Sequence, residues 1–274
     1  MTRIAVIGGG QMGEALLAGI IKSGVEPRDI VVAENNGERA QEIRDRYGVL
    51  VTDVADAAES SDYVFIAVKP KDVPAVVKPI SDVTTNLEKE VVLVSIAAGV
   101  PTTFYENLLS AGSPVIRVMP NTPMLVSAGV CAVSAGRYAQ PEQVKMVSEL
   151  LAATGTVIEV SENDMDLVTA VSGSGPAYFF LMVEAMIEAA VGLGMTRPTA
   201  AKLTIGTIAG SAKMLEETGN TPVELRESVT SPGGTTAAAL RTFEDGGLRS
   251  MVYDAMEACA EKSAELRPKE PSIG

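Results

Sequence analysis

The sequence predicts two parts that differ in fold class: an α/β part with a doubly wound parallel sheet, followed by an all-helical part. Through the first half, short β-branched apolar runs alternate with helical patterns, which is typical of a parallel sheet covered on both faces. From Asp164 onward the strand pattern stops and helical patterns continue. We therefore expect one domain over residues 1–161 and a second over residues 162–274.

In the first part, apolar β-branched runs define the expected strands, and amphipathic stretches that end at glycines such as Gly24 and Gly48 define the helices. The expected strands are 4–7, 30–33, 49–51, 63–68, 91–95 and 115–118, with possible edge strands at 130–134 and 156–160. The expected helices are 11–23, 38–47, 53–60 and 141–153.

In the second part, prolines and hydroxyl side chains mark helix starts, and glycines mark helix ends. Thr221 and Glu224, for example, form a capping-box pattern around Pro222. The expected helices are 164–170, 177–191, 196–217, one that opens at 221, one that ends at about 245, and 248–266. The residues after Arg267 are expected to fray.

Composition restricts the class of protein. The 274 residues carry a net charge of −13, and the 22 Lys and Arg residues are scattered, which argues against binding to nucleic acid or to an anionic membrane. No apolar run reaches the length that spans a bilayer, and the chain opens on a predicted strand rather than a signal peptide. The two cysteines, Cys131 and Cys259, suit a reducing compartment. We therefore expect a cytoplasmic protein.

Histidine is absent from the sequence. This excludes histidine as a general acid, a general base or a metal ligand, and with two distant cysteines it excludes a Cys/His zinc site. No metal is expected. Proton transfer would have to use a hydroxyl, a carboxylate, a lysine, water or the substrate itself.

A glycine loop follows the first expected strand and opens the first expected helix. Its spacing is Gly8-x-Gly10-x-x-Gly13, in which glycines let the backbone turn and approach a phosphate while the helix N-terminus offers free N–H groups. The alternative is an ordinary turn between a strand and a helix. The context favours a pyrophosphate site in a dinucleotide-binding domain. Its residues are Gly8, Gly9, Gly10, Gln11, Met12 and Gly13.

Ligands of such a sheet lie beyond the carboxyl ends of its strands. The residues that follow the strands are therefore expected to line one crevice. They are Glu34, Asn35 and Asn36 after the second strand, Lys69 and Pro70 after the fourth, Ala97, Ala98 and Gly99 after the fifth, and Asn121 within 119–123 after the sixth.

The choice of dinucleotide stays open at this point. A carboxylate at Glu34 usually binds the adenosine ribose and favours NAD, whereas a 2′-phosphate there would be repelled. Arg39 follows shortly and is either a 2′-phosphate ligand or a solvated helix residue.

The second part contains an apolar helix and a second glycine loop. Residues 178–183 are consecutively apolar or aromatic, so we expect this helix to be buried all round, through dimerisation. The second glycine loop, residues 231–236, offers N–H groups that suit a carboxylate. The alternative is plain helix capping by Ser231 or Thr235, and the 172–176 turn with Ser174 has the same ambiguity.

At these motifs the chain resembles the pyrroline-5-carboxylate reductase family over nearly its whole length. The shared motifs are GGGQMG at 8–13, AVKP at 67–70, AAG at 97–99, RVMPNTP at 117–123, SGSGPAY at 172–178 and VTSPGGTTAAAL at 229–240. The resemblance implies a Rossmann-type domain, a helical dimerisation domain and in many members a ring of dimers.

The resemblance also implies roles for the loops. Residues 8–13, 34–36, 69–70 and 97–99 would hold a nicotinamide dinucleotide, and we count Asn121 with them. The expected substrate residues are Ser174, Ser231, Gly233, Gly234, Thr235 and Thr236, with Thr236 near the ring nitrogen as the candidate catalytic residue. NADPH is the family's usual cofactor, whereas Glu34 makes NADH possible.

The implied reaction is hydride transfer to the C=N carbon of 1-pyrroline-5-carboxylate, which yields L-proline in the final step of proline biosynthesis. Because the imine nitrogen is basic enough to carry its own proton, the absence of histidine is no obstacle. The protein mainly has to hold cofactor and substrate in hydride-transfer geometry.

Two other functions compete with this interpretation. A β-hydroxyacid or 6-phosphogluconate-type dehydrogenase would need a catalytic lysine and asparagine pattern in the helical part, which Lys202, Lys213 and Lys262 do not provide. A non-catalytic nucleotide-sensing protein with this fold would be favoured by loss of glycines, yet both glycine loops are intact.

Overall fold

A computed structural model describes residues 2–85 and 89–267, so the expected fraying after Arg267 lies outside the described residues. The sheet has the order β3-β2-β1-β4-β5-β6-β7-β8, and every neighbouring pair is parallel except β6 with β7. Its strands are β1 Ile4–Ile7, β2 Ile30–Ala33, β3 Leu50–Thr52, β4 Tyr63–Ile66, β5 Val92–Ser95, β6 Val115–Met119, β7 Gly129–Ala135 and β8 Gly155–Glu159. The predicted doubly wound sheet is confirmed. Strands β2 and β3 are added on one side of β1, and β4 to β8 are added on the other side.

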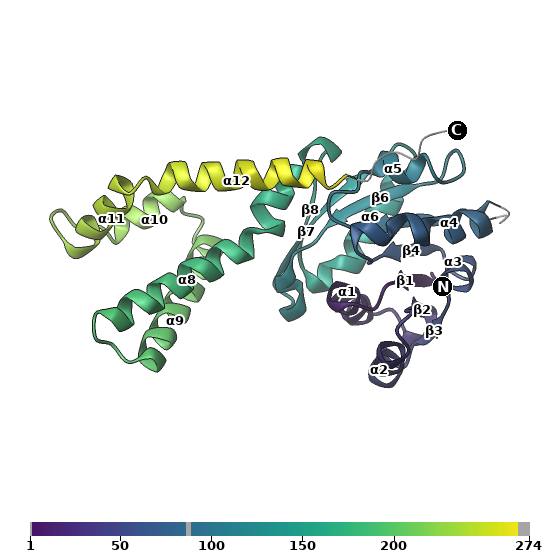
Figure 1. The fold of residues 1–274 in the computed structure, drawn as a ribbon, viewed down its shortest axis with the longest axis horizontal. Coiled ribbons are helices and arrows are strands. Elements are labelled where there is room, and N and C mark those ends of the chain that lie inside the picture. Colours follow the sequence, from purple (N-terminus) through teal and green to yellow (C-terminus); the bar gives the residue numbers. More distant parts are fainter. Residues whose placement is uncertain (1, 86–88, 268–274) are drawn as a thin grey trace. The chain divides into compact units, whose positions relative to one another are not determined.

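Helices cover both faces of this sheet (Figure 1). They are α1 Gln11–Lys22, α2 Gly37–Tyr47, α3 Val54–Glu59, α4 Val73–Thr84, α5 Thr102–Glu106 and α6 Pro141–Leu151. The sequence pattern did not indicate α4 or α5. Pro74 and Pro79 fall within α4 and obscured its pattern, although Pro74 stands in the first turn, where proline is tolerated.

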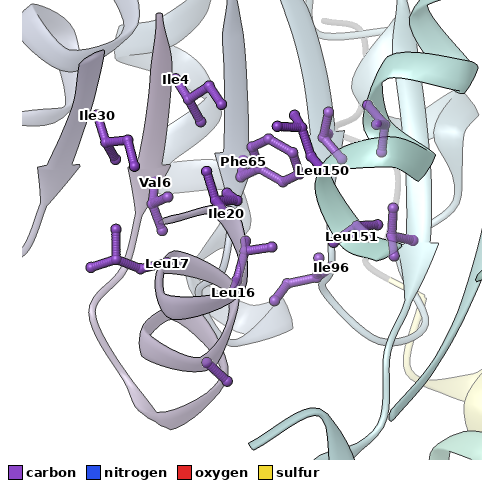
Figure 2. Packing of buried hydrophobic residues seen from close by; sticks show 14 of the residues in the cluster. Ile4, Val6, Leu16, Leu17, Ile20, Ile30, Phe65, Ile96, Leu150 and Leu151 are labelled. Carbon is purple, nitrogen blue, oxygen red and sulfur yellow. The ribbon is translucent and has the colours of Figure 1, made fainter. Parts of the chain in front are cut away.

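Alternate residues of each strand serve two hydrophobic clusters. Ile4 and Val6 of β1 face one cluster with α1, α2 and α6, whereas Ala5 and Ile7 face the other with α3, α4 and α5. Figure 2 shows the first cluster, in which Phe65 of β4 lies among apolar side chains of α1 and α6. A parallel sheet buried on both faces explains why its strands read as continuous apolar runs.

By its contacts the chain divides into two compact units. The sheet unit runs to Ser174 and is joined by the chain from Cys259 onward, and the helical unit is Gly175–Ala258. The predicted domain boundary between 161 and 162 stays a prediction. The later helices are α7 Met165–Val168, α8 Gly175–Gly192, α9 Arg197–Glu217, α10 Pro222–Ser228, α11 Thr235–Asp245 and α12 Leu248–Glu265. The capping box of α10 at Thr221 is confirmed.

The turn expected around Ser174 is instead helical, which corrects that prediction. Thr169–Gly173 forms a π-helical turn, and α8 begins at Gly175. The backbone N–H of Ser174 donates to the carbonyl of Thr169 at 2.8 Å. The wider π turn carries the chain through two glycines and into Pro176 without leaving the helical path.

Helix α8 is exposed in the single chain, and the sequence predicted that its burial would come from dimerisation. Phe179, Phe180 and Leu181 are 61%, 66% and 66% exposed. The helical stretch Glu162–Gly192 contains an 18-residue window with a mean hydropathy of 1.3, so by length and composition alone it could cross a membrane. The expectation that no stretch reaches this length was therefore wrong. Exposed aromatic and aliphatic side chains on this scale mark a surface that something covers.

A buried ion pair fastens the chain after β8 to the sheet. Arg117 of β6 is 3% exposed, and its Nη1 donates to Oε1 of Glu162 at 2.8 Å. The backbone N–H of Thr102 points at the same carboxylate oxygen at 3.3 Å. Within the described part of the chain, Nε and Nη2 of Arg117 have no hydrogen-bond partner. Glu162 therefore supplies the negative charge that balances this buried cation.

Glu162→Gln is expected to lower the free energy of unfolding by about 2 kcal/mol, because Arg117 loses its charge-assisted hydrogen bond and is left buried without a counter-charge. Urea unfolding at fixed protein concentration measures the loss. Glu159→Gln removes an exposed carboxylate from β8 and is expected to change little. Equal stability of the two variants would contradict this account.

Candidate functional site

The first glycine loop has the geometry of a phosphate cradle. Gly8 has a φ of +104°, which a side chain rarely tolerates. A Cβ on Gly13 would lie 1.9 Å from the carbonyl oxygen of Gly8, so helix α1 could not pack against the end of β1 with any other residue. Gly10 has no atom within 4 Å of where a Cβ would be, and this open space is where a phosphate can approach.

The N-terminus of α1 is available to an anion. Its N-cap is Gly10, which provides no side-chain cap. The first N–H groups of a helix have no partner within the helix, and those of α1 belong to the glycine loop. A dinucleotide pyrophosphate therefore fits this loop through backbone N–H groups and the helix dipole.

Glu34 is tied into the loop through both of its oxygens. The N–H of Gly9 donates to Oε2 and the N–H of Asn36 donates to Oε1, each at 2.8 Å. The side chain of Asn36 in turn caps α2 by accepting from the N–H of Arg39. A carboxylate is thus held at the end of β2, where the adenosine ribose lies in this fold.

Arg39 faces this position but is engaged by other carboxylates. Its Nε donates to the carbonyl of Gly9 at 2.7 Å, and its Nη atoms bind Glu14 and Glu42. Glu14 also accepts from Arg46 and from the hydroxyl of Tyr47. Although burial acts in the opposite sense, the hydrogen bonds from Arg39 and Tyr47 hold the pKa of Glu14 below its usual value.

The loops after the other parallel strands lie at the same edge of the sheet. Lys69 follows β4 and is exposed, and Pro70 opens a short 3₁₀ turn. After β5, the N–H of Ala97 donates to Oγ of Ser95 at 3.2 Å. The structure thus gathers the predicted cofactor residues of the sheet unit along one edge, as the parallel topology requires.

Asn121, predicted at the cofactor site, makes two hydrogen bonds to backbone groups. Its Nδ2 donates to the carbonyl of Ser172 at 3.1 Å, and its Oδ1 accepts from the N–H of Val130 at 2.8 Å. The side chain is 7% exposed, and it links the end of β6 to the π-helical turn. Its proposed contact with the cofactor stays a prediction.

The second glycine loop, in the helical unit, forms a turn before α11. The N–H of Gly234 donates to the carbonyl of Ser231 at 3.0 Å, and Gly233 has a φ of +69°. The N-cap of α11 is Gly234, and the helix has no side-chain cap. The alternative of capping by Ser231 or Thr235 is therefore wrong, and the first N–H groups of α11 are free for an anion. Thr236 is half-buried in this first turn.

Ser174 lies in the sheet unit, beside the last helix. The thiol of Cys259 on α12 donates to Oγ of Ser174 at 3.2 Å. The sequence did not indicate this neighbour. It also did not indicate that Asp166 binds Ser263 and Arg267, or that Ser263 lies beside Gly99 of the 97–99 loop. Contacts between an early loop and the last helix leave no local signal in a sequence.

Two protein-family models match parts of the chain. Residues 162–266 match a model described as pyrroline-5-carboxylate reductase dimerisation. Residues 3–99 match a model described as NADP oxidoreductase, coenzyme F420-dependent. The two matches follow the order of a nucleotide-binding part and a helical part that the motifs predict.

Known proteins match the chain over nearly its full length. Pyrroline-5-carboxylate reductases from Corynebacterium melassecola and Escherichia coli K12 are 51% and 40% identical to it, over 97% and 96% of this chain and 99% and 98% of theirs.

Solved structures agree with these relatives. A pyrroline-5-carboxylate reductase from Coxiella burnetii has a TM-score of 0.91 at 37% identity, over 98% of this chain and 99% of that one. A Plasmodium falciparum pyrroline carboxylate reductase with NADP bound has a TM-score of 0.86 at 28% identity, over 97% and 98%. At these identities and coverages, the chain belongs to the pyrroline-5-carboxylate reductase family.

Proposed function

We propose that this chain catalyses the NAD(P)H-dependent reduction of 1-pyrroline-5-carboxylate to L-proline, the final step of proline biosynthesis, in the cytoplasm. Beyond family membership, the observation that carries the proposal is the open backbone cradle at Gly10, which would fit the pyrophosphate of a nicotinamide dinucleotide. When bound, the reduced cofactor supplies a hydride to the imine carbon.

The chain's own groups would bind and orient the reactants. The free N–H groups at the start of α11, together with Ser231, Gly233, Gly234 and Thr235, would hold the substrate carboxylate. Thr236 would orient the ring nitrogen through its hydroxyl. The imine carries its own proton when it is an iminium, so hydride addition gives a neutral amine, and no side chain has to act as an acid at that step.

The wild-type protein is expected to oxidise NADH or NADPH only when 1-pyrroline-5-carboxylate is present. Thr236→Val is expected to lower kcat about 100-fold, because it removes the hydroxyl and keeps the shape, whereas Thr236→Ser should retain most of the activity. The absorbance of the reduced cofactor measures both effects.

Thr242→Val, on the same helix, is the matched control and should behave like the wild type. If the wild type oxidises neither cofactor when substrate is added, the proposed reaction is wrong. Full turnover by Thr236→Val at saturating substrate would remove Thr236 from the mechanism.

For the cofactor, we propose that Glu34 reduces the family's usual preference for NADPH, so that NADH is also a competent reductant. Its carboxylate is fixed by two N–H groups at the end of β2, where it would accept from a ribose hydroxyl and repel a 2′-phosphate. Arg39 would have to leave Glu14 or Glu42 to bind that phosphate.

Glu34→Gln is expected to shift the ratio of kcat/KM for NADPH over NADH about tenfold toward NADPH, because one negative charge is removed beside the 2′-position. Steady-state kinetics with both cofactors measure the ratio. Glu59→Gln removes an exposed carboxylate at the end of α3 and controls for net charge. An unchanged ratio in Glu34→Gln would show that the carboxylate does not discriminate.

The helical part supports a homo-oligomer. Residues 162–266 match a dimerisation family, and the exposed apolar side chains of α8 need a cover. We propose a homodimer through these helices, with association of dimers into a ring as the larger assembly.

Phe180→Glu is expected to shift the protein toward monomers, because a charge buried in an apolar interface is costly. Light scattering after size-exclusion chromatography measures the mass across a dilution series. Leu50→Glu changes a side chain on edge strand β3 that is similarly exposed, at 65% against 66% for Phe180. It should leave the mass unchanged. Dissociation by both variants, or by neither, would contradict the proposed interface.

A further inference from the structure

The 97–99 loop is packed against the end of the last helix. Gly99 has a φ of +74°, and a Cβ there would lie 3.0 Å from the carbonyl oxygen of Ser263 and 3.1 Å from Cβ of Leu266. Ser263 stands in the last turn of α12 and Leu266 directly follows this helix, and both belong with the sheet unit. The glycine is needed at this position for its backbone conformation and for this close approach.

Asp166 holds those last turns of α12 in place. Its Oδ1 accepts from the buried hydroxyl of Ser263 at 2.7 Å, and its Oδ2 accepts from Nη2 of Arg267 at 2.5 Å. Asp166 stands on α7, next to Met165, which is fully buried. Ala98 packs against the small apolar cluster that contains Met165. The loop, α7 and the end of α12 therefore form one packed group.

The position of this group in the sheet indicates which half of a dinucleotide it affects. The pyrophosphate loop follows β1, and Glu34 follows β2 on one side of β1. The 97–99 loop follows β5, on the other side of β1 beyond β4. With the adenosine ribose at the β2 side, the nicotinamide half extends toward β4 and β5.

We propose that the last turns of α12, held by Asp166, position the 97–99 loop and thereby determine how strongly the chain binds the nicotinamide half of its cofactor. Asp166 is a positioning residue: it acts through Ser263 and Arg267 and not by touching the cofactor. The proposal rests on the proposed use of a nicotinamide dinucleotide, and it does not depend on which imine is reduced.

The test compares how the full-length protein binds NADH and ADP-ribose, which lacks the nicotinamide ring. Asp166→Ala is expected to weaken NADH binding about fivefold, the effect of losing positioning hydrogen bonds, and to leave ADP-ribose binding within about twofold. Isothermal titration calorimetry measures both dissociation constants. Asp164→Ala removes an exposed carboxylate from the residue just before α7 and should change neither constant.

A second variant keeps the test decisive if Asp166→Ala is unstable. Arg267→Met removes one of the two partners of Asp166 at an exposed position and should give a smaller loss of NADH binding, again without a change for ADP-ribose. Equal weakening of both ligands, or of neither, overturns the proposal. If the wild type binds NADH and the variants lose that binding selectively, but no 1-pyrroline-5-carboxylate is reduced, the proposed function fails and this inference stands.

Discussion

The close approach of helix α1 to the end of β1 is the contact on which the nucleotide-binding unit depends. It is possible because Gly13 has no side chain to meet the carbonyl oxygen of Gly8. The same approach buries Leu16, Leu17 and Ile20 of α1 in the core and places the helix N-terminus beside the open space at Gly10. Core packing and the phosphate cradle are therefore two consequences of one backbone contact.

An acidic chain can hold an anionic cofactor because the attraction is local. The net charge is −13, yet each predicted anion site consists of backbone N–H groups at a helix start, before α1 and before α11. Where a cation does approach the ribose end, at Arg39, it is shared with Glu14 and Glu42. At the proposed ribose position, the charge of Arg39 is therefore already balanced by the carboxylates of Glu14 and Glu42.

The helical unit contains an apolar helix that the single chain does not bury. The run from Tyr178 indicates a helix without a solvated face, and in the single chain that helix is largely exposed. The match of residues 162–266 to a dimerisation family supports the proposal that another copy of the chain covers this helix. By length and composition alone, the same apolar stretch could also cross a membrane.

The sequence by itself determined the local features and their order along the chain. These are the alternation of strands and helices, both glycine loops and the carboxylate at Glu34. These features are local, because turn geometry and apolar periodicity are written in neighbouring residues. The structure was needed to show that Gly234 is the N-cap of α11 without a side-chain cap. Only the tertiary structure decided that Asp166 binds Ser263, which lies beside the 97–99 loop. Such contacts connect residues far apart in sequence, so no periodicity or spacing can reveal them.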